Sequence, residues 1–556
     1  MIHHLQHIAD LVRIFRLKGV RKIVVSPGSR NAPLIHAFAS DGFFELHSIV
    51  DERSAAFYGL GISLSCNKPV ALLCTSGSAG LNYAPALAEA YYRHVPLIAV
   101  TADRPPHLIG QQDNQTIRQA GMFRNFVKHD VHIELSIQNA GELSDVHANI
   151  NEAINRAVEG VAGPVHLNVP LDEPLYVELP HESENIEITE PRVLQNSDFE
   201  DLKKAWAKSR RCLVVVGQHE PDGELNVVLN RIADKNQAVV LAEPLSNIKG
   251  KNVIAELDRI MMCVEENPSV HFYPDLLISM GGHVLSKRLK NWLSKLQISH
   301  YRISEEPDGI DTYRNLTRNV TGGVLSVIAA LESIEYSHLS AYSEIWKQES
   351  TTNHDVHSHL FNQIPFSDLL VFSQLIKALP KDAVLHLGNS SPVRYAQLFD
   401  LRKFSAVYAN RGVSGIDGCV STAVGYASQS NQSNYLLLGD LSLMYDSNGL
   451  WNRSFPKNLK IVVVNNGGGG IFSLLKEPAS VNGFNRFVEA STPARIVCIA
   501  KAFELSYMYA DSALKLENQL DEFIDMAKPV LFEIDTTGQD NSNVYFQYID
   551  AIKQYK

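Results

Sequence analysis

The sequence lacks the features that direct a chain into a membrane or an export pathway. None of its apolar runs approaches the roughly 20 residues that a transmembrane helix needs. The N-terminal segment has no signal-peptide core, because polar residues such as His3, Gln6 and Asp10 interrupt its apolar ones. Low-complexity tracts and short-period repeats are also absent. We therefore expect a cytoplasmic globular protein with no integral membrane span.

Basic charge and cysteine are both scarce. Lys and Arg total 50 against 61 Asp and Glu, which gives a formal net charge of -11. Such a chain is a poor general binder of nucleic acid or anionic lipid, so no nucleic-acid partner is expected and anionic ligands need local arginines. The six cysteines lie far apart without metal-site spacing, which favours free thiols in a reducing compartment.

Complete nucleotide-binding motifs are missing as well. The chain contains neither G-x-G-x-x-G nor G-x-x-x-x-G-K-[ST], although it has a run of four glycines. This absence weighs against a protein that merely binds nucleotides on Rossmann-like domains.

The chain does contain a repeated alternation of short apolar runs and helix-length segments. Each run ends in glycine, proline or small polar residues, as parallel strands with helical crossovers do, and ligands bind at the carboxyl ends of such strands. The expected strands lie at 21–28, 69–77, 95–105, 163–170, 210–218, 237–244, 275–282, 299–304, 383–390, 405–412, 433–442, 459–468 and 529–535.

The length of 556 residues suggests roughly three domains of about 150–200 residues each. Polar stretches at 173–198 and 333–365 separate three such units. We therefore predict an α/β protein of three Rossmann-like domains with mainly parallel sheets, at 1–180, 181–350 and 351–556.

Two of the expected strands end in potential metal ligands. The 24 residues between Asp440 and Asn465 leave room for one helix and one strand, which brings both strand ends to one edge of the sheet. Asp440 and Asn466 can then direct oxygens at one hard cation such as Mg²⁺, and a glycine carbonyl just beyond adds a third. The glycine run offers backbone groups to a diphosphate. Taken singly, Asp440 is equally well a helix N-cap and the glycines a turn.

The string GDLS followed by NNGGGG resembles the metal-binding signature of thiamine-diphosphate-dependent enzymes. The resemblance implies thiamine diphosphate as cofactor and Mg²⁺, with Mn²⁺ as a substitute, held by Asp440, Asn466 and the carbonyl of Gly468. Leu441 replaces the general family's glycine, as is typical of the branch that acts in menaquinone (vitamin K2) biosynthesis. Gly467 and Gly470 depart from the family, which often has asparagine and a polar residue there.

The resemblance covers nearly the whole chain and implies the architecture of pyruvate decarboxylase-like enzymes. It also implies a homodimer or homotetramer with active sites at subunit interfaces. The implied cofactor contacts are Glu52, Thr75, Ser76, Gly77, Ile416, Gly439, Asp440, Leu441, Ser442, Asn466, Gly468, Ile471, Phe472 and Leu475. For the apolar members of this set, ordinary core packing is an equally good explanation.

The segment HSIVDERSAAFYGLG places Glu52 just past an expected strand of the first domain. Enzymes of this family use such a carboxylate to hydrogen-bond the aminopyrimidine ring of the cofactor. The carboxylate favours the imino tautomer, whose nitrogen takes the proton from the thiazolium carbon. We therefore predict that Glu52 is catalytic. The alternative is that Asp51 and Glu52 only complement a helix N-terminus.

Arginines follow several strand ends of this acidic chain. The motifs SPGSR, TADRPP, NQ-x-IRQ and NRG-x-SGIDG resemble those of the menaquinone branch, whose substrates are 2-oxoglutarate and isochorismate. Both are dicarboxylates, and guanidinium groups bind carboxylates in a bidentate manner. The implied substrate contacts are Ser29, Arg30, Arg104, Asn114, Gln115, Arg288, Ser390, Arg394 and Arg411. Any single arginine has a solvated role, or a role in an allosteric anion site, as its alternative.

The reaction implied by the resemblance is that of a transferase. It decarboxylates 2-oxoglutarate and adds the succinyl-semialdehyde carbanion to isochorismate in conjugate fashion. Two rivals stay open. Another thiamine-diphosphate-dependent 2-oxoacid decarboxylase or carboligase would share Glu52, Asp440 and Asn466 but would need fewer carboxylate-binding arginines. A non-catalytic anion-binding protein of Rossmann-like domains would keep the glycine loop without the chemistry of Glu52.

Overall fold

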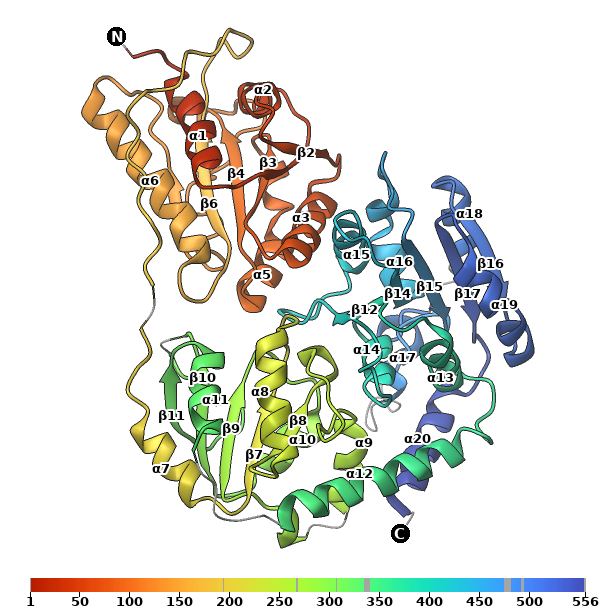
Figure 1. Ribbon diagram of the computed structural model, residues 1–556. Helices are drawn as coiled ribbons and strands as arrows, with labels where there is room; N and C mark the ends of the chain where they lie inside the picture. Colours follow the sequence, from red (N-terminus) through yellow and green to blue (C-terminus); the bar gives the residue numbers. More distant parts are fainter. Residues whose placement is uncertain are drawn as a thin grey trace. The chain divides into compact units, whose positions relative to one another are not determined.

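Three sheets follow one another along the chain (Figure 1). The computed structural model describes residues 2–193, 195–266, 269–306, 308–334, 341–474, 482–491 and 495–554. The strand orders are β2-β1-β3-β4-β6-β5, β11-β10-β9-β7-β8 and β13-β12-β14-β15-β17-β16. Neighbouring strands are mainly parallel, with helices in the crossovers. The predicted α/β class with three mainly parallel sheets is therefore confirmed.

The strands match the apolar runs closely, since each run forms a buried strand. The first sheet contains β1 (Lys22–Val25), β2 (Glu45–Ser48), β3 (Val70–Cys74), β4 (Leu97–Asp103), β5 (Asp130–His132) and β6 (Val165–Pro170). The second contains β7 (Cys212–Val216), β8 (Val239–Ala242), β9 (Leu276–Met280), β10 (Ser299–Ser304) and β11 (Leu316–Thr321). The third contains β12 (Val384–Leu387), β13 (Ala406–Tyr408), β14 (Asn434–Gly439), β15 (Leu459–Asn465), β16 (Ser506–Ala510) and β17 (Val530–Asp535).

The helices lie between these strands in the order of the chain. With the first sheet occur α1 (Gln6–Leu17), α2 (Ala32–Ser40), α3 (Glu52–Cys66), α4 (Ser78–Leu81), α5 (Ala84–Arg93) and α6 (Ala140–Val158). With the second occur α7 (Glu200–Lys208), α8 (Gly223–Asp234), α9 (Leu257–Glu266), α10 (Lys287–Leu293), α11 (Val324–Glu332) and α12 (Ala341–Leu360). With the third occur α13 (Asp368–Ala378), α14 (Ser391–Ala396), α15 (Cys419–Ala427), α16 (Asp440–Tyr445), α17 (Phe484–Phe487), α18 (Ile496–Ala502), α19 (Ala513–Asp525) and α20 (Asn541–Gln554).

Four strands lie outside the apolar runs given above, namely β2, β5, β11 and β16, and all four are at sheet edges. An edge strand has a neighbour on one side only, and each of these four keeps partly exposed residues. Their sequences therefore lack the continuous apolar run that marks a central strand such as β15, all seven residues of which are buried.

By its contacts the chain forms two compact units. Unit 1 comprises Met1–Val193, Asn410–Asn431 and Tyr445–Leu459, and unit 2 comprises Leu194–Ala409, Gln432–Met444 and Lys460–Lys556. Unit 1 thus combines the first sheet with two segments from the last third of the chain. The three domain boundaries given above stay a prediction.

Within unit 1, helix α3 packs closely against α15. Two glycines allow this approach. A Cβ atom on Gly61 would lie 2.0 Å from the carbonyl oxygen of Thr422, and one on Gly425 would lie 2.1 Å from that of Tyr58. Because the backbones of the two helices are in contact, α3 and the Glu52 at its start are held rigidly.

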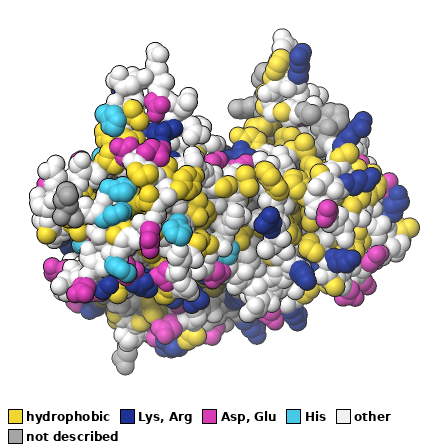
Figure 2. Space-filling model, turned by 90° about the horizontal axis from the view of Figure 1, so that it is seen from above, with side chains coloured by type: hydrophobic (Ala, Val, Ile, Leu, Met, Phe, Trp, Pro, Cys, Tyr) yellow, Lys and Arg dark blue, Asp and Glu magenta, His cyan; other side chains and the backbone are white. Residues whose placement is uncertain are grey.

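Among the described residues, no helix combines the length and the apolar character needed to cross a membrane. On the face drawn in Figure 2, Lys and Arg side chains are scattered among acidic and uncharged ones. The six cysteines form no disulfide.

Candidate active site

The predicted cofactor residues Thr75, Ser76 and Gly77 follow β3 of the first sheet, which neighbours β1. The loops after β1 and β3 touch, because a Cβ atom on Gly28 would lie only 2.3 Å from Cβ of Thr75. The hydroxyls of Thr75 and Ser76 are buried, and neither has a hydrogen-bond partner among the described residues. A buried hydroxyl without a partner is costly, so this edge of the sheet has the polar capacity for a ligand.

Gly77 continues this edge with a backbone angle φ of +83°, which favours glycine. Its amide donates to Oε1 of Gln119 at 2.8 Å, and Nε2 of Gln119 donates to Oδ1 of Asn168 at 3.0 Å. Gln119 and Asn168 are completely buried. This buried chain of hydrogen bonds fixes the backbone of the loop that carries Thr75 and Ser76.

Glu52 lies at the first position of α3, directly after the N-cap Asp51, whose side chain accepts a hydrogen bond from the amide of Ser54. The Glu52 side chain is half-buried, and burial, with a smaller contribution from Asp51, raises its pKa. Asp51 therefore takes the capping role that the alternative assigned to both carboxylates. Glu52 remains available for hydrogen bonding to a ligand ring.

Two predicted substrate arginines lie close together in unit 1. Arg30 is buried, donates from Nη1 to the carbonyl of Leu171 at 2.9 Å, and forms an ion pair with Glu173 at 3.2 Å. Burial and the nearby charge of Arg104 lower the pKa of Arg30. Arg104 pairs with Asp113 at 3.6 Å. Two guanidinium groups held near each other favour an anionic ligand.

The polar residues predicted beside these arginines lie on exposed loops. Ser29, Asn114 and Gln115 are all exposed. Gln115 has a φ of +53°, and Ser390 in unit 2 has a φ of +73°. Non-glycine residues in this region are strained, and such strain is concentrated at ligand sites.

A buried carboxylate that sequence reasoning did not identify holds the loop of Arg411. Glu89 on α5 is 1 % exposed and accepts hydrogen bonds from the amides of Gly412 and Val413, each at 2.7 Å. A Cβ atom on Gly412 would lie 2.3 Å from the carbonyl oxygen of Glu89, so only glycine fits. Glu89 thereby fixes the segment that contains Arg411 and the half-buried Ile416.

In unit 2, Asp440 is the first residue after β14 and is 1 % exposed. Burial raises its pKa to about 7, with a smaller contribution from the charges of Asp368 and Glu533. Its Oδ2 atom is buried and has no hydrogen-bond partner in the described part of the chain. A buried carboxylate oxygen in this state fits a metal ligand better than a helix cap.

The two asparagines at the end of β15, Asn465 and Asn466, have different hydrogen-bond partners. Asn465 is occupied, because its Nδ2 donates to Glu533 at 2.7 Å and its Oδ1 accepts from the amide of Gly467 at 3.2 Å. Asn466 donates from Nδ2 to Asp368 at 2.8 Å, whereas its Oδ1 is buried without a partner among the described residues. Asn466 is therefore the asparagine with an oxygen available for a cation.

Three of the four glycines in the run have a conformational or steric explanation. Gly467 and Gly468 have φ angles of +82° and +151°, and a Cβ atom on Gly468 would lie 2.8 Å from the carbonyl oxygen of Glu489. A Cβ atom on Gly470 would lie 2.7 Å from Nδ2 of Asn466. Gly470, one of the two departures from the family pattern, therefore leaves room for the Asn466 side chain.

The chain after these glycines contains the residues predicted to form the apolar side of the site. The amide of Gly469 donates to the carbonyl of Glu489 at 2.6 Å, which turns the chain toward Ile471 and Phe472. Phe472 is 39 % exposed and Ile471 half-exposed, so neither belongs to the core of this unit. Leu475 lies outside the described residues.

The remaining predicted residues of this edge lie beside Asp440. Gly439 and Leu441 are partly exposed, and Ser442 is buried on α16. The described residues contain no cluster of three or more His, Cys, Asp or Glu arranged to hold a metal. A metal here would instead take oxygens from Asp440, Asn466 and Gly468, which are ligands that Mg²⁺ accepts.

Arg288 and Arg394 of unit 2 both lie near the buried Asp258, where burial raises the pKa of the carboxyl and the charge of each arginine opposes that rise. Arg288 pairs with Glu265 at 2.9 Å and with Asp258 at 3.7 Å. Arg394 has no ion-pair partner in the part of the chain that the structure describes. A guanidinium has five N–H donors, so each arginine keeps donors for a substrate carboxylate. Both therefore remain predicted substrate contacts.

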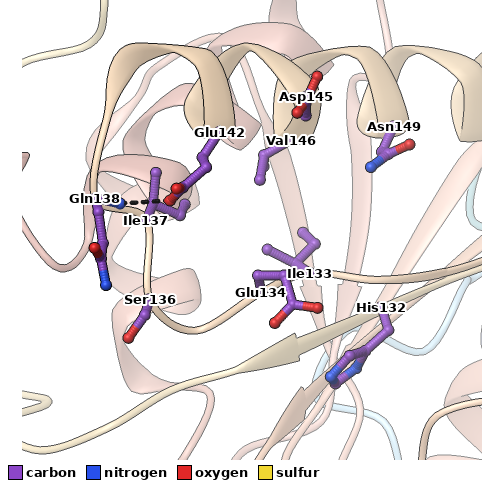
Figure 3. Close-up of a pocket in the computed structure, with 10 residues that line it drawn as sticks. All are labelled: His132, Ile133, Glu134, Ser136, Ile137, Gln138, Glu142, Asp145, Val146 and Asn149. Carbon is purple, nitrogen blue, oxygen red and sulfur yellow. Dashed lines mark hydrogen bonds between the residues drawn. The ribbon is translucent and has the colours of Figure 1, made fainter.

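A cavity of about 300 Å³ lies elsewhere in unit 1, between the loop after β5 and helix α6 (Figure 3). Its carboxylates are Glu134, Glu142 and Asp145, and Glu142 accepts a hydrogen bond from the amide of Gln138 at 2.7 Å. None of the predicted site residues lines this cavity.

Replacing Gly470 by alanine is expected to weaken Mg²⁺ binding about 10–100-fold, because the new methyl group displaces the amide of Asn466. Titration calorimetry with Mg²⁺ at saturating thiamine diphosphate measures this change. Gly223→Ala is the control, since a Cβ atom there meets nothing within 4 Å. An unchanged Mg²⁺ affinity for Gly470→Ala would remove the steric role of Gly470.

Comparison with protein families gives matches along most of the chain. The N-terminal TPP binding domain of thiamine pyrophosphate enzymes matches residues 8–122. The middle domain of thiamine pyrophosphate enzymes matches residues 186–387, and the C-terminal TPP binding domain matches residues 388–534. The first and third matches include Glu52 and the Asp440–Asn466 pair, respectively.

Curated relatives match over almost their full length, and all those named here are 2-succinyl-5-enolpyruvyl-6-hydroxy-3-cyclohexene-1-carboxylate synthases. The protein from Desulfotalea psychrophila is 38% identical over 96% of this chain and 99% of its own. That from Flavobacterium psychrophilum is 38% identical over 97% of each chain, and that from Porphyromonas gingivalis is 36% identical over 98% and 97%. The chain therefore belongs to the 2-succinyl-5-enolpyruvyl-6-hydroxy-3-cyclohexene-1-carboxylate synthase family of thiamine pyrophosphate enzymes.

Proposed function

We propose that this protein is a thiamine-diphosphate-dependent transferase of menaquinone biosynthesis. It decarboxylates 2-oxoglutarate and adds the resulting four-carbon unit to isochorismate. The observation that carries the proposal is the 38% identity to synthases of this name over nearly the whole of both chains. The arginines described above support it, because both substrates are dicarboxylates.

The residues of unit 2 are assigned to cofactor binding. Asp440, Asn466 and the carbonyl of Gly468 hold Mg²⁺, or Mn²⁺ in its place, and the amides of the glycine loop receive the diphosphate. The unpartnered Oδ2 of Asp440 and Oδ1 of Asn466 fit this task. When bound, thiamine diphosphate supplies the electron sink for decarboxylation.

The residues of unit 1 are assigned to proton transfer and substrate binding. Glu52 accepts a hydrogen bond from the cofactor ring and holds the proton that activation requires. Arg30, Arg104 and Arg411 bind substrate carboxylates, and their rigid supports orient them before the substrate arrives. We further propose that the protein works in the cytoplasm as a homodimer or homotetramer with active sites at subunit interfaces.

The direct test incubates the purified protein with 2-oxoglutarate, isochorismate, thiamine diphosphate and Mg²⁺. We expect release of carbon dioxide together with the coupled product, identified by mass spectrometry, and loss of both when Mg²⁺ is chelated. Pyruvate in place of 2-oxoglutarate is the control and should react poorly. Carbon dioxide release without the coupled product would favour another thiamine-diphosphate-dependent decarboxylase, and no turnover would favour the non-catalytic alternative.

Replacing Arg394 by glutamine is expected to raise the KM for one carboxylate substrate about 10–100-fold, which corresponds to the loss of a charge-assisted hydrogen bond. Steady-state kinetics with each substrate varied in turn identifies which substrate Arg394 binds. Arg231→Gln is the matched control, because Arg231 lies on the surface of the same unit and pairs with Glu332. Equal KM values for the Arg394 variant and the control would exclude the binding role.

A further inference from the structure

The buried Asp368 makes three hydrogen bonds that the proposed reaction does not use directly. It is the first residue of α13 and is 2 % exposed. Its Oδ2 accepts a hydrogen bond from Nδ2 of Asn466 at 2.8 Å, and its Oδ1 accepts one from Oγ1 of Thr536 at 2.5 Å. Its own amide donates to Oδ1 of Asn541 at 2.8 Å. Hydrogen bonds thus fix both carboxylate oxygens and the backbone amide of Asp368.

These contacts determine which way the amide of Asn466 faces. An ionised carboxylate only accepts hydrogen bonds, so Asn466 must present its NH₂ group to Asp368. The amide oxygen then lies on the opposite branch of the side chain, where it is buried and has no partner among the described residues. An asparagine without such a neighbour would exchange its O and N positions at little cost.

A purely structural role explains Asp368 poorly. Burying a carboxylate costs free energy unless it is paired, and Asp368 has no ion-pair partner in the described part of the chain. Apolar side chains or an asparagine would support α13 with less desolvation.

We propose that Asp368 is a positioning residue that turns the amide oxygen of Asn466 toward the metal of the cofactor site. The inference rests on the proposed function insofar as that function places a Mg²⁺ ion beside Asn466. Thr536 supports Asp368 in turn, because its hydroxyl fixes the second carboxylate oxygen. The two hydrogen-bond partners of the Asp368 carboxylate, Asn466 and Thr536, lie 98 and 168 residues from it in the sequence.

The test compares Asp368→Ala with Asp368→Asn by titration calorimetry of Mg²⁺ at saturating thiamine diphosphate, without substrates. Alanine frees the amide of Asn466, and we expect Mg²⁺ to bind about 10–100-fold more weakly. Asparagine can still accept from Asn466 and donate to Thr536, whose hydroxyl then turns to the carbonyl of Asn465, 3.3 Å away. We therefore expect Asp368→Asn to bind Mg²⁺ within about threefold of the wild type, because the hydrogen bond that orients the ligand is kept.

A double-mutant cycle separates positioning from general destabilisation. In an Asn466→Ala background, Asp368→Ala should cause no further loss of Mg²⁺ affinity. If Asp368→Ala does not fold, Thr536→Val replaces it, with an expected loss of a few-fold. A folded Asp368→Ala variant with wild-type Mg²⁺ affinity, an Asp368→Asn variant as weak as the alanine variant, or additive losses in the cycle would each overturn the proposal.

The same titrations distinguish this inference from the proposed function. A wild-type protein that binds neither Mg²⁺ nor thiamine diphosphate overturns both. Normal cofactor binding without reaction of 2-oxoglutarate and isochorismate overturns the proposed function alone. The Mg²⁺ affinities of the Asp368 variants relative to the wild type then still support the role of Asp368. If the wild type binds its cofactors and catalyses the reaction, but the Asp368→Ala variant has the same Mg²⁺ affinity as the wild type, only the role of Asp368 is overturned.

Discussion

Glu52→Gln is expected to lower kcat about 100–10,000-fold while thiamine diphosphate still binds, because the variant loses only the general acid–base contribution of the carboxylate. Glutamine has the same shape and hydrogen-bonding reach, but it carries no negative charge to favour the protonated ring nitrogen. The half-buried setting that raises the pKa of Glu52 also strengthens its hydrogen bonds to a ligand. Carbon dioxide release measures kcat, and calorimetry measures cofactor affinity.

The neighbouring carboxylate supplies a matched control for Glu52. Asp51 caps α3 through the amide of Ser54 at 3.0 Å and accepts from Asn448 at 2.6 Å. Asparagine caps helices about as well as aspartate, so Asp51→Asn should keep kcat within a few-fold of the wild type. Should Glu52→Gln retain full turnover, or should Asp51→Asn lose as much, Glu52 has no specific catalytic role and the helix-terminus alternative gains support.

Asp440→Asn is expected to weaken Mg²⁺ binding by more than about 100-fold, since a lost ligand costs more than the roughly 10–100-fold of a group that only supports one. The variant keeps the volume of the side chain but removes the charge that attracts the cation. Cofactor affinity should fall with it, because the proposed site binds the diphosphate through the metal. Calorimetric titration with Mg²⁺ and with thiamine diphosphate follows both losses.

The same variant should raise the thermal stability of the metal-free protein. The Oδ2 of Asp440 is buried without a hydrogen-bond partner among the described residues, and the charges of Asp368 and Glu533 lie nearby. Removing one of these carboxylate charges relieves both desolvation and repulsion. A higher Tm together with weaker Mg²⁺ binding indicates a functional site, whereas a lower Tm with unchanged binding would identify Asp440 as a helix cap.

Much of the fold could be predicted because central parallel strands are buried on both faces. Such strands must be continuous apolar runs, and β1, β3, β4 and β15 were recognisable for that reason. The edge strands β2, β5, β11 and β16 form no such run, since partial exposure permits polar residues in them. The grouping of 410–431 and 445–459 with the first sheet also depends on contacts that no local pattern reveals.

Candidate site residues could be proposed from the sequence where a polar residue follows a strand. Asp440 and Asn466 come directly after β14 and β15, Glu52 comes shortly after β2, and the resemblance to thiamine-diphosphate-dependent enzymes gave each a predicted role. Glu89 and Asp368 were not found, although both are buried carboxylates. The only local signal was an acidic residue at a helix position that the hydrophobic pattern assigns to the interior, and that signal alone does not name a partner.

By itself, the sequence determined the α/β class, the run of apolar strands and the strand-end residues that can act on a ligand, because these depend on local periodicity and on residue chemistry. Only the tertiary structure decided which groups support them. Glu89 lies 323 residues from Gly412, and Asp368 lies 98 residues from Asn466. It also showed that Gly470 is small because Asn466 needs the space. Hydrogen bonds and steric exclusion act over a few ångströms, so they depend on which distant segments the fold brings together.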